Sequence, residues 1–199
     1  MNETNRPQPA GFSLTELLVV VSIMGVLVAV TVPSLTRVRS SIVLRAAAQE
    51  AASVLHFARG RAMARDVNTG VKFTQNNGIW FYTIYDDIDG DGLRNDDIAA
   101  GIDLRVQGPD TVLAGDRNVR IGFAEPRPND PDTGDPFAPT ANAVQFGLAR
   151  IASFSRRGEG TSGSLYITDG TGGAAAVRVH GATGRVRITH YDAETGRWK

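Results

Sequence analysis

The clearest spacing of chemically active side chains is that of a calcium-binding loop. Carboxylates stand at positions one, three and five, a glycine at six and an amide at nine, in Asp87, Asp89, Asp91, Gly92 and Asn95. In such loops these positions surround one cation with oxygen ligands, and a bidentate acid at position twelve completes the site. Position twelve is Ile98 here, so Asp96 or Asp97 would have to replace that acid. The alternative is a solvated Asp and Gly turn between two strands, which needs no ion.

Basic side chains alternate with apolar ones near the C-terminus. The basic residues of this stretch are Arg178, His180, Arg185 and Arg187. Successive side chains of a strand point to opposite faces, so these four would share one face of a strand pair and the valines between them the other. Arginine can bind phosphate with two hydrogen bonds, which makes this face a candidate phosphate-binding patch. The alternative is the ordinary solvated face of a half-buried sheet.

A single carboxylate stands in an otherwise apolar segment. Glu16 is the only charged residue between positions 12 and 32, and a helix of that length spans about 30 Å, the thickness of a bilayer core. A charge inside a bilayer costs on the order of 3 kcal/mol, so its presence indicates a function. One alternative is a capping box with Ser13. Another is an ordinary secretory signal peptide, which would have an apolar core without a carboxylate.

The elements expected to carry these residues are a long helix and then strands. Residues 12–33 predict a membrane helix, and residues 34–66 predict its amphipathic continuation, with Pro33 expected to kink the helix between them. The apolar side chains that recur at helical spacing are Val43, Ala47, Ala51, Val54 or Leu55, Ala58 and Ala62. Residues 1–11 contain two prolines and no apolar periodicity, which predicts a disordered leader.

Residues 67–199 have a β pattern. Strands are expected at 71–73, 79–85, 104–106, 119–123, 144–146, 165–167, 177–179 and 186–188. Asn77-Gly78 between the first two is typical of a hairpin turn. Residues 125–142 are rich in Pro and Asp and predict a long exposed loop. A helix followed by antiparallel strands predicts an α+β head with the helix packed on the sheet.

The segment around Glu16 resembles the type IV pilin superfamily. The resemblance is carried by a short polar leader ending in Gly11, then Phe12-Ser13-Leu14-Thr15-Glu16-Leu17 and an apolar helix. It implies a pilin-like fold, cleavage by a prepilin peptidase after Gly11 and methylation of the new amine on Phe12. In that superfamily the carboxylate pairs with the N-terminal amine of a neighbouring subunit, which is the assembly role implied for Glu16. Other pilin-like subunits are the implied partners.

Three further features resemble the GspH/FimT group of pseudopilins and minor pilins. They are the aromatic strand that ends in the Asp-rich turn, the segment 162–169 and Gly184-Arg185-Val186-Arg187. In FimT-like minor pilins a similar Gly-Arg-x-Arg segment contributes to DNA binding during uptake. The resemblance therefore implies DNA as a candidate partner of Arg185 and Arg187, with Arg178 on the same face.

The side of the membrane on which the head lies is predicted differently by the resemblance and by the positive-inside rule. Arg37, Arg39 and Arg45 follow the apolar run, and the positive-inside rule alone would keep that side cytoplasmic. The resemblance implies the reverse: a single-pass protein of the bacterial inner membrane with a periplasmic head, incorporated into a pilus or pseudopilus. We follow the resemblance.

Composition limits the functions further. The chain has 199 residues with 21 acidic and 21 basic side chains, so its net charge does not indicate a nucleic-acid partner. It has no cysteine, which excludes disulfides and zinc-cysteine sites. The three histidines fall on separate expected elements, and no nucleophile elbow or phosphate-cradling loop occurs. We therefore expect no enzyme and no required cofactor, with calcium the one candidate ligand.

The sequence thus predicts a structural subunit. The favoured function is that of a GspH/FimT-type pseudopilin in a type II secretion pseudopilus, where it would assist protein secretion. The alternative is a FimT-like minor type IV pilin that binds DNA during uptake. A more remote alternative is a calcium-dependent, membrane-anchored surface protein.

Overall fold

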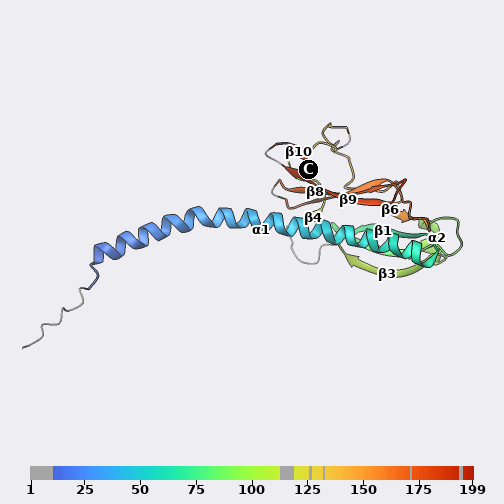
Figure 1. The fold of residues 1–199 in the computed structure, drawn as a ribbon, viewed down its shortest axis with the longest axis horizontal. Coiled ribbons are helices and arrows are strands. Elements are labelled where there is room, and N and C mark those ends of the chain that lie inside the picture. Colours follow the sequence, from blue (N-terminus) through green and yellow to red (C-terminus); the bar gives the residue numbers. More distant parts are fainter. Residues whose placement is uncertain (1–10, 113–118, 126, 132, 171, 193–194) are drawn as a thin grey trace, which may run out of the picture. The chain divides into compact units, whose positions relative to one another are not determined.

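The chain divides into two compact units, Met1–Arg39 and Ser40–Lys199. The computed structural model describes residues 11–112, 119–125, 127–131, 133–170, 172–192 and 195–199, without the side chains of 30–38. Of the expected leader, only Gly11 lies within the described residues. Figure 1 shows the elements coloured along the sequence.

Helix α1 (Leu14–Arg65) begins in the first unit and ends in the second. Its described large apolar side chains from 12 to 28 are all exposed, with Phe12 at 79% and Leu14 at 80%. The helix is continuous through position 33, where the sequence predicts a kink; this position lies among the residues whose side chains are not described. Such an exposed apolar surface needs a partner or an apolar environment.

A membrane-spanning length of apolar helix is not found in the described part of the chain. Among the described residues, no helix is both long and apolar enough to cross a membrane. The last residues of the expected span, 30–32, belong to the stretch without described side chains.

The second half of α1 buries one face in the second unit. The buried side chains recur at the spacing of one helical face: Leu44, Ala47, Ala48, Ala51, Ala52, Leu55, Ala58 and Ala62. This confirms the amphipathic pattern expected from the sequence. The sequence left open whether Val54 or Leu55 belongs to this face. Leu55 is fully buried and Val54 is half-buried.

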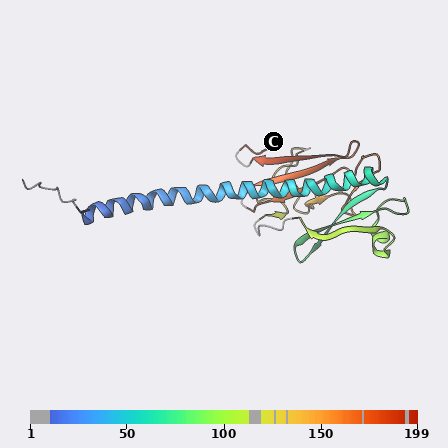
Figure 2. The ribbon, with the colours of Figure 1, turned by 60° about the horizontal axis from the view of Figure 1, so that its bottom comes forward.

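Two antiparallel sheets form the rest of the second unit. The first has the order β3 (Leu104–Thr111), β2 (Ile79–Asp86), β1 (Thr69–Asn76) and β6 (Ile151–Phe154). The second has the order β10 (Arg197–Trp198), β9 (Arg185–Asp192), β8 (Ala174–His180), β7 (Gly163–Thr168) and β4 (Arg120–Ile121), and β5 (Val144–Gln145) also pairs with β7. Figure 2 shows the second half of α1 running along both sheets. The chain is α+β, as expected.

Every expected strand overlaps an observed one, and the first hairpin forms as expected. Asn77 and Gly78 have φ of 49° and 80°, the positive values that a type I′ turn requires at both central residues. Three short elements were not expected: β6, β10 and α2 (Asn95–Ala100). Strand β6 pairs with β1 and β10 with β9, so their partners rather than their own sequence patterns define them. Asn and Asp open α2, and both are weak helix formers.

One hydrophobic core joins the helix to both sheets. It includes Leu55 of α1, Val71 and Ile84 of the first sheet, and Leu165 and Val177 of the second. Each of these side chains is at most 1% exposed. The helix therefore holds the two sheets together by shared burial, which is the dominant favourable term in folding.

The Pro- and Asp-rich segment 125–142 is not wholly exposed. Phe137 is 7% exposed, and its ring lies 4.6 Å from that of Phe123 and 4.9 Å from that of Tyr166. The indole N–H of Trp198 donates a hydrogen bond of 2.6 Å to the carbonyl of Asn129. The expected long loop is present, but the burial of Phe137 fastens part of it onto the second sheet.

An ion pair between the half-buried Arg61 and the buried Asp86 joins α1 to the end of β2. Arg61 donates from Nε to Oδ1 of Asp86 at 3.0 Å and from Nη2 to Oδ2 at 2.7 Å. Thr69 donates a third hydrogen bond to Oδ1 at 2.8 Å. The hydrogen bond to Asp86 raises the pKa of Arg61, against the lowering by burial. Asp86 is therefore fully engaged with the helix and with β1.

Candidate functional site

The start of α1 holds Glu16 and its cap. Ser13 accepts a hydrogen bond of 3.2 Å from the backbone N–H of Glu16 through its hydroxyl oxygen. The Glu16 carboxylate is exposed and makes no hydrogen bond or ion pair within the described residues. A capping box would need this carboxylate to accept from the backbone N–H of Ser13. Ser13 thus caps the helix without the side chain of Glu16, which counts against capping as its only role.

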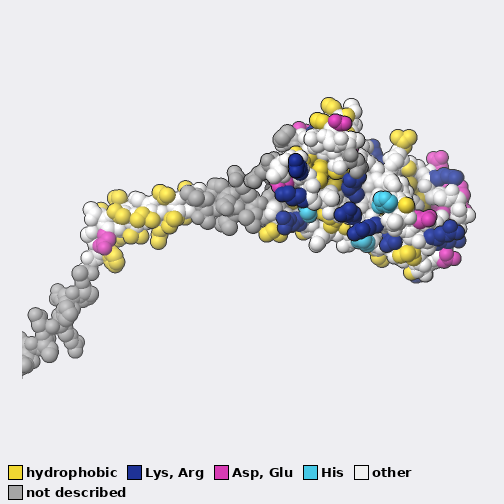
Figure 3. All heavy atoms as spheres, turned by 45° about the horizontal axis from the view of Figure 1, so that its top comes forward, with side chains coloured by type: hydrophobic (Ala, Val, Ile, Leu, Met, Phe, Trp, Pro, Cys, Tyr) yellow, Lys and Arg dark blue, Asp and Glu magenta, His cyan; other side chains and the backbone are white. Residues whose placement is uncertain are grey.

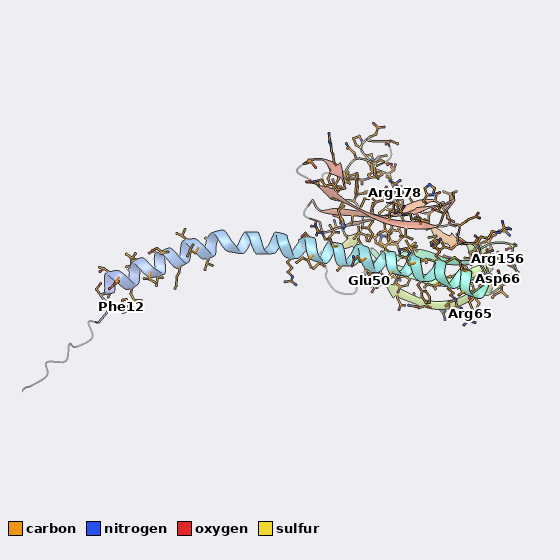
Figure 4. All side chains as sticks on the ribbon, in the orientation of Figure 1. Phe12, Glu50, Arg65, Asp66, Arg156 and Arg178 are labelled. Carbon is orange, nitrogen blue, oxygen red and sulfur yellow. The ribbon has the colours of Figure 1, made fainter. Side chains whose placement is uncertain are left out.

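The expected cleavage point lies in exposed, non-helical backbone. Gly11 and Phe12 precede Leu14, the first helical residue, and both are exposed. A Cβ added at Gly11 would meet no atom within 4 Å. In Figure 4 Phe12 stands at the start of the helix, and Figure 3 shows apolar side chains along the turns that follow. The peptide bond between Gly11 and Phe12 is therefore accessible to an enzyme.

The basic side chains near the C-terminus lie on one face of the β8–β9 pair. Arg178 is directly opposite Arg187, and His180 is directly opposite Arg185. Val177 and Val179 are opposite Ile188 and Val186, and they belong to the core or pack against it. The alternation inferred from the sequence is therefore confirmed. We call Arg178, His180, Arg185 and Arg187 the basic patch.

Two arginines face each other across the basic patch. Like charges directly opposite each other on neighbouring strands are destabilising. Three of the four side chains are exposed and Arg178 is half-buried. Figure 3 shows basic and histidine side chains gathered on this side of the second unit, and Figure 4 labels Arg178 on β8. The arrangement is suited to binding a phosphate or another anion.

Arg59 of α1 fixes the β8–β9 turn beside this patch. Its Nε donates to the carbonyl of Gly158 at 2.9 Å, and its Nη2 donates to that of Thr183 at 3.1 Å. Gly184 in the turn has φ of 58°, and an added Cβ would meet the Gly158 carbonyl oxygen at 2.0 Å. The helix thereby sets the position of the turn that carries Arg185.

Three of the four expected calcium ligands converge. One carboxylate oxygen each of Asp87, Asp89 and Asp91 lies within 4.8 Å of the other two. Asp87 accepts hydrogen bonds from the backbone N–H groups of Gly90 at 2.8 Å and Gly92 at 3.0 Å. Asp91 is ion-paired with Arg94. Asn95, the fourth expected ligand, is exposed at the start of α2 and has no contact with the three aspartates among those given for the described residues.

The environment of Asp87 favours its charged form. Burial by itself raises the pKa of this carboxyl, but hydrogen bonds from the side-chain amide of Asn68, from the backbone of Gly90 and from its other neighbours lower it on balance. The amide of Asn68 donates at 2.8 Å. A charged, nearly buried carboxylate at the first position of the loop suits cation binding.

The sequence reasoning missed Asp103, which the fold brings near this loop. Asp103 is 3% exposed. Burial raises the pKa of its carboxyl, and the charges of Asp87, Asp97 and Asp89 raise it further, against a lowering by the backbone N–H of Arg94. Spacing alone could not have identified Asp103, because the helical turn of α2 separates it from the loop.

The histidines do not converge, in agreement with the sequence reasoning. His56 is exposed on α1, His180 belongs to the basic patch, and His190 lies on the opposite face of β9. Burial lowers the pKa of His190, and the charge of Arg45 lowers it further. His190 therefore favours its neutral form at the interface between α1 and the second sheet.

The N-terminal segment of this chain matches a known family model. Residues 6–32 match the family model described as the prokaryotic N-terminal methylation motif, a range that contains Gly11, Phe12 and Glu16. No curated protein and no solved structure matches the chain. The motif supports a type IV pilin-like protein, and it implies processing by a prepilin peptidase and assembly with other pilin subunits.

Proposed function

We propose that this chain is a minor pilin-like structural subunit of the GspH/FimT type, which enters a type II secretion pseudopilus and assists protein secretion. The observation that carries the proposal is the exposed apolar start of α1, with one unpaired carboxylate in its first turn. Burying apolar surface stabilises by about 25 cal/mol per Å². Lipid would cover this surface before assembly, and the helices of neighbouring subunits would cover it afterwards.

Glu16 gives the assembly its register. Cleavage after Gly11 creates a positive amine on Phe12, four residues before the carboxylate. Each of these two charges alone is costly in an apolar environment. When Glu16 of one subunit pairs with the amine of its neighbour, the two charges compensate each other. The subunit is anchored in the inner membrane by α1, with its leader in the cytoplasm and the second unit in the periplasm.

Replacing Gly11 by valine is expected to leave the leader attached. A β-branched side chain at the residue before the cut would obstruct the peptidase, so less than a tenth of the chain should be processed. Gly25→Val is the matched control, because an added Cβ meets no atom within 4 Å at either glycine. Intact-mass spectrometry of chains from the native membrane would show the wild type and the control without residues 1–11 and with one methyl group. Normal cleavage of Gly11→Val would overturn the proposal.

A second function, DNA binding as in FimT-like minor pilins, is favoured by the opposed basic side chains of β8 and β9. Arg178 lies opposite Arg187 and His180 lies opposite Arg185, so four side chains that can donate to a phosphate share one face. The chain as a whole has no net charge, so binding would need a local basic surface such as this patch.

The double substitution Arg185→Ala and Arg187→Ala is expected to weaken DNA binding at least tenfold. Each phosphate contact contributes about 0.9 to the slope of log K against log salt, so the slope should fall by up to about 2. The test is a salt series of duplex binding by the full-length chain in detergent. Arg65→Ala with Arg105→Ala removes the same charge from exposed positions outside the patch. Equal loss in both double variants, or no binding by the wild type at low salt, would leave secretion as the function.

A further inference from the structure

Two neighbouring arginines lie in the turn that follows β6. Arg156 and Arg157 are both exposed, and neither side chain has a hydrogen bond or ion pair within the described residues. The N–H of Gly158 donates to the carbonyl of Ser155 at 2.8 Å, and the N–H of Arg157 donates to the Ser155 hydroxyl at 3.3 Å. These bonds close a tight turn that presents both arginines to solvent. We call residues 155–160 the arginine turn.

The arginine turn is joined to the turn between β8 and β9. The N–H of Gly160 donates to the carbonyl of Gly181 at 2.8 Å, and the N–H of Gly181 donates to the Ser162 hydroxyl at 3.0 Å. Gly184 lies so close that an added Cβ would be 2.0 Å from the carbonyl oxygen of Gly158. The two turns are therefore side by side, although more than twenty residues separate them in the chain.

Arg59 of α1 holds both turns at once. Its guanidinium donates to the carbonyl of Gly158 in the arginine turn and to that of Thr183 in the β8–β9 turn. The donors of a guanidinium have a rigid, planar arrangement, so they hold the two carbonyls in one relative position. A Cβ added at Gly158 would also lie 2.8 Å from the sulfur of Met63, so the arginine turn rests directly on the helix.

The basic patch and the arginine turn form one continuous basic surface. The patch runs along the strand pair from Arg178 and Arg187 to His180 and Arg185, which border the β8–β9 turn. The arginine turn lies on the other side of that turn. Figure 4 labels Arg178 on β8 and Arg156 at the end of the second unit where α1 ends. Two residues of a strand span about 7 Å, so this surface is longer than a single phosphate group.

We propose that the arginine turn is the second half of the DNA site, and that one DNA duplex lies across both the turn and the basic patch. This inference rests on the proposed DNA function and adds Arg156 and Arg157 to its binding residues. A duplex carries one phosphate charge per about 1.7 Å of its axis. It can therefore present phosphates to two separate groups of arginines, which a single phosphate cannot do.

The composition of this surface favours nucleic acid over an anionic membrane. Surfaces that bind membranes combine basic side chains with large apolar ones that enter the lipid. Among the described residues, none of the exposed large hydrophobic side chains falls within 155–160 or 178–187. These two ranges hold five arginines and one acid, Glu159, which lines a cleft with Asn68 and Ser153. Their serine and threonine hydroxyls and glycine N–H groups are further donors of the kind that contacts phosphates.

The full-length chain in detergent should bind one duplex per chain, with a slope of log K against log salt of about 4 to 5 in magnitude if all five arginines contact phosphates. Arg156→Ala with Arg157→Ala should weaken binding at least tenfold and lower the slope by about 2. Both residues are exposed, so the unfolding temperature should stay at the wild-type value. Fluorescence anisotropy of a labelled duplex of about 20 base pairs, between about 50 and 200 mM salt, measures the affinity, the slope and the stoichiometry.

The matched control is Arg105→Ala with Arg197→Ala, which removes the same charge from exposed positions outside both ranges and should bind as the wild type does. If the wild type binds DNA and the arginine-turn variant keeps the wild-type slope, this inference is overturned and the DNA function stands. Two duplexes per chain would likewise overturn it, because the turn would then be a separate site. Absence of binding by the wild type at low salt would remove the DNA function and this inference together.

Discussion

Replacing Glu16 by alanine is expected to leave cleavage after Gly11 intact and to abolish incorporation of the subunit into filaments. The carboxylate makes no contact within the described part of its own chain, so its loss should not disturb the fold. In the assembled state it would be the partner of a neighbour's amine in apolar surroundings. Removing one partner of a buried ion pair costs about 3–5 kcal/mol, which corresponds to more than a hundredfold loss of incorporation.

Two further variants separate charge from shape. Glu16→Gln keeps the size and hydrogen-bonding capacity of the side chain but removes its charge, and should fail as the alanine variant does. Ser22→Ala is the matched control, because the Ser22 hydroxyl is polar, lies in the same segment and is satisfied by the carbonyl of Leu18 at 2.7 Å. Immunoblotting of sheared filaments against whole membranes measures the incorporated fraction. Filaments that contain Glu16→Gln at the wild-type level would show that the charge has no role in assembly.

Substitution of Asp86 by alanine is expected to lower the free energy of unfolding by about 3 kcal/mol, because it removes the acceptor of three hydrogen bonds and leaves the half-buried Arg61 without its partner. Asp86 is 4% exposed, and three donors converge on its carboxylate. Urea unfolding of the full-length chain in detergent, followed by the fluorescence of the buried Trp80, measures the change.

The control for the Arg61–Asp86 pair is an ion pair at the surface. Lys199 is ion-paired with Asp192 at the surface, and its side chain is 68% exposed. Exposed pairs contribute about 0–1 kcal/mol, so Lys199→Ala should have little effect. Replacing both Arg61 and Asp86 by apolar residues should cost less than Asp86→Ala alone, since no unpaired charge remains. A loss below about 1 kcal/mol in Asp86→Ala would mean that the pair is effectively hydrated.

Several features of this protein are local in the sequence, and these were predicted correctly. Helical periodicity identified the buried face of α1, because a period of 3.6 residues depends only on near neighbours. Asn77-Gly78 identified the first hairpin, because only residues that tolerate positive φ fit its turn. Alternation in β8 and β9 placed the basic patch on one face before the pairing was known. The methylation motif is a continuous stretch that needs no fold to be recognised.

Other features arise only from contacts between distant residues. Strand β6 is a short stretch with no alternation of its own, and it exists because it pairs with β1 some eighty residues earlier in the chain. Phe137 is buried because Phe123 and Tyr166 lie beside it in the folded state. Pairing and burial of this kind depend on chain segments that no local window contains.

The sequence by itself determined the chemistry at the start of the chain, and the tertiary structure decided the chemistry of the acidic loop. Glu16 is identified by its neighbours in the chain, because one carboxylate among apolar residues is costly wherever that helix is buried. Asp103 has no such local sign, and in the sequence it is an acid before a strand. Only the pairing of β2 with β3, in which Asp86 lies opposite Leu104, brings Asp103 beside Asp87 and buries it.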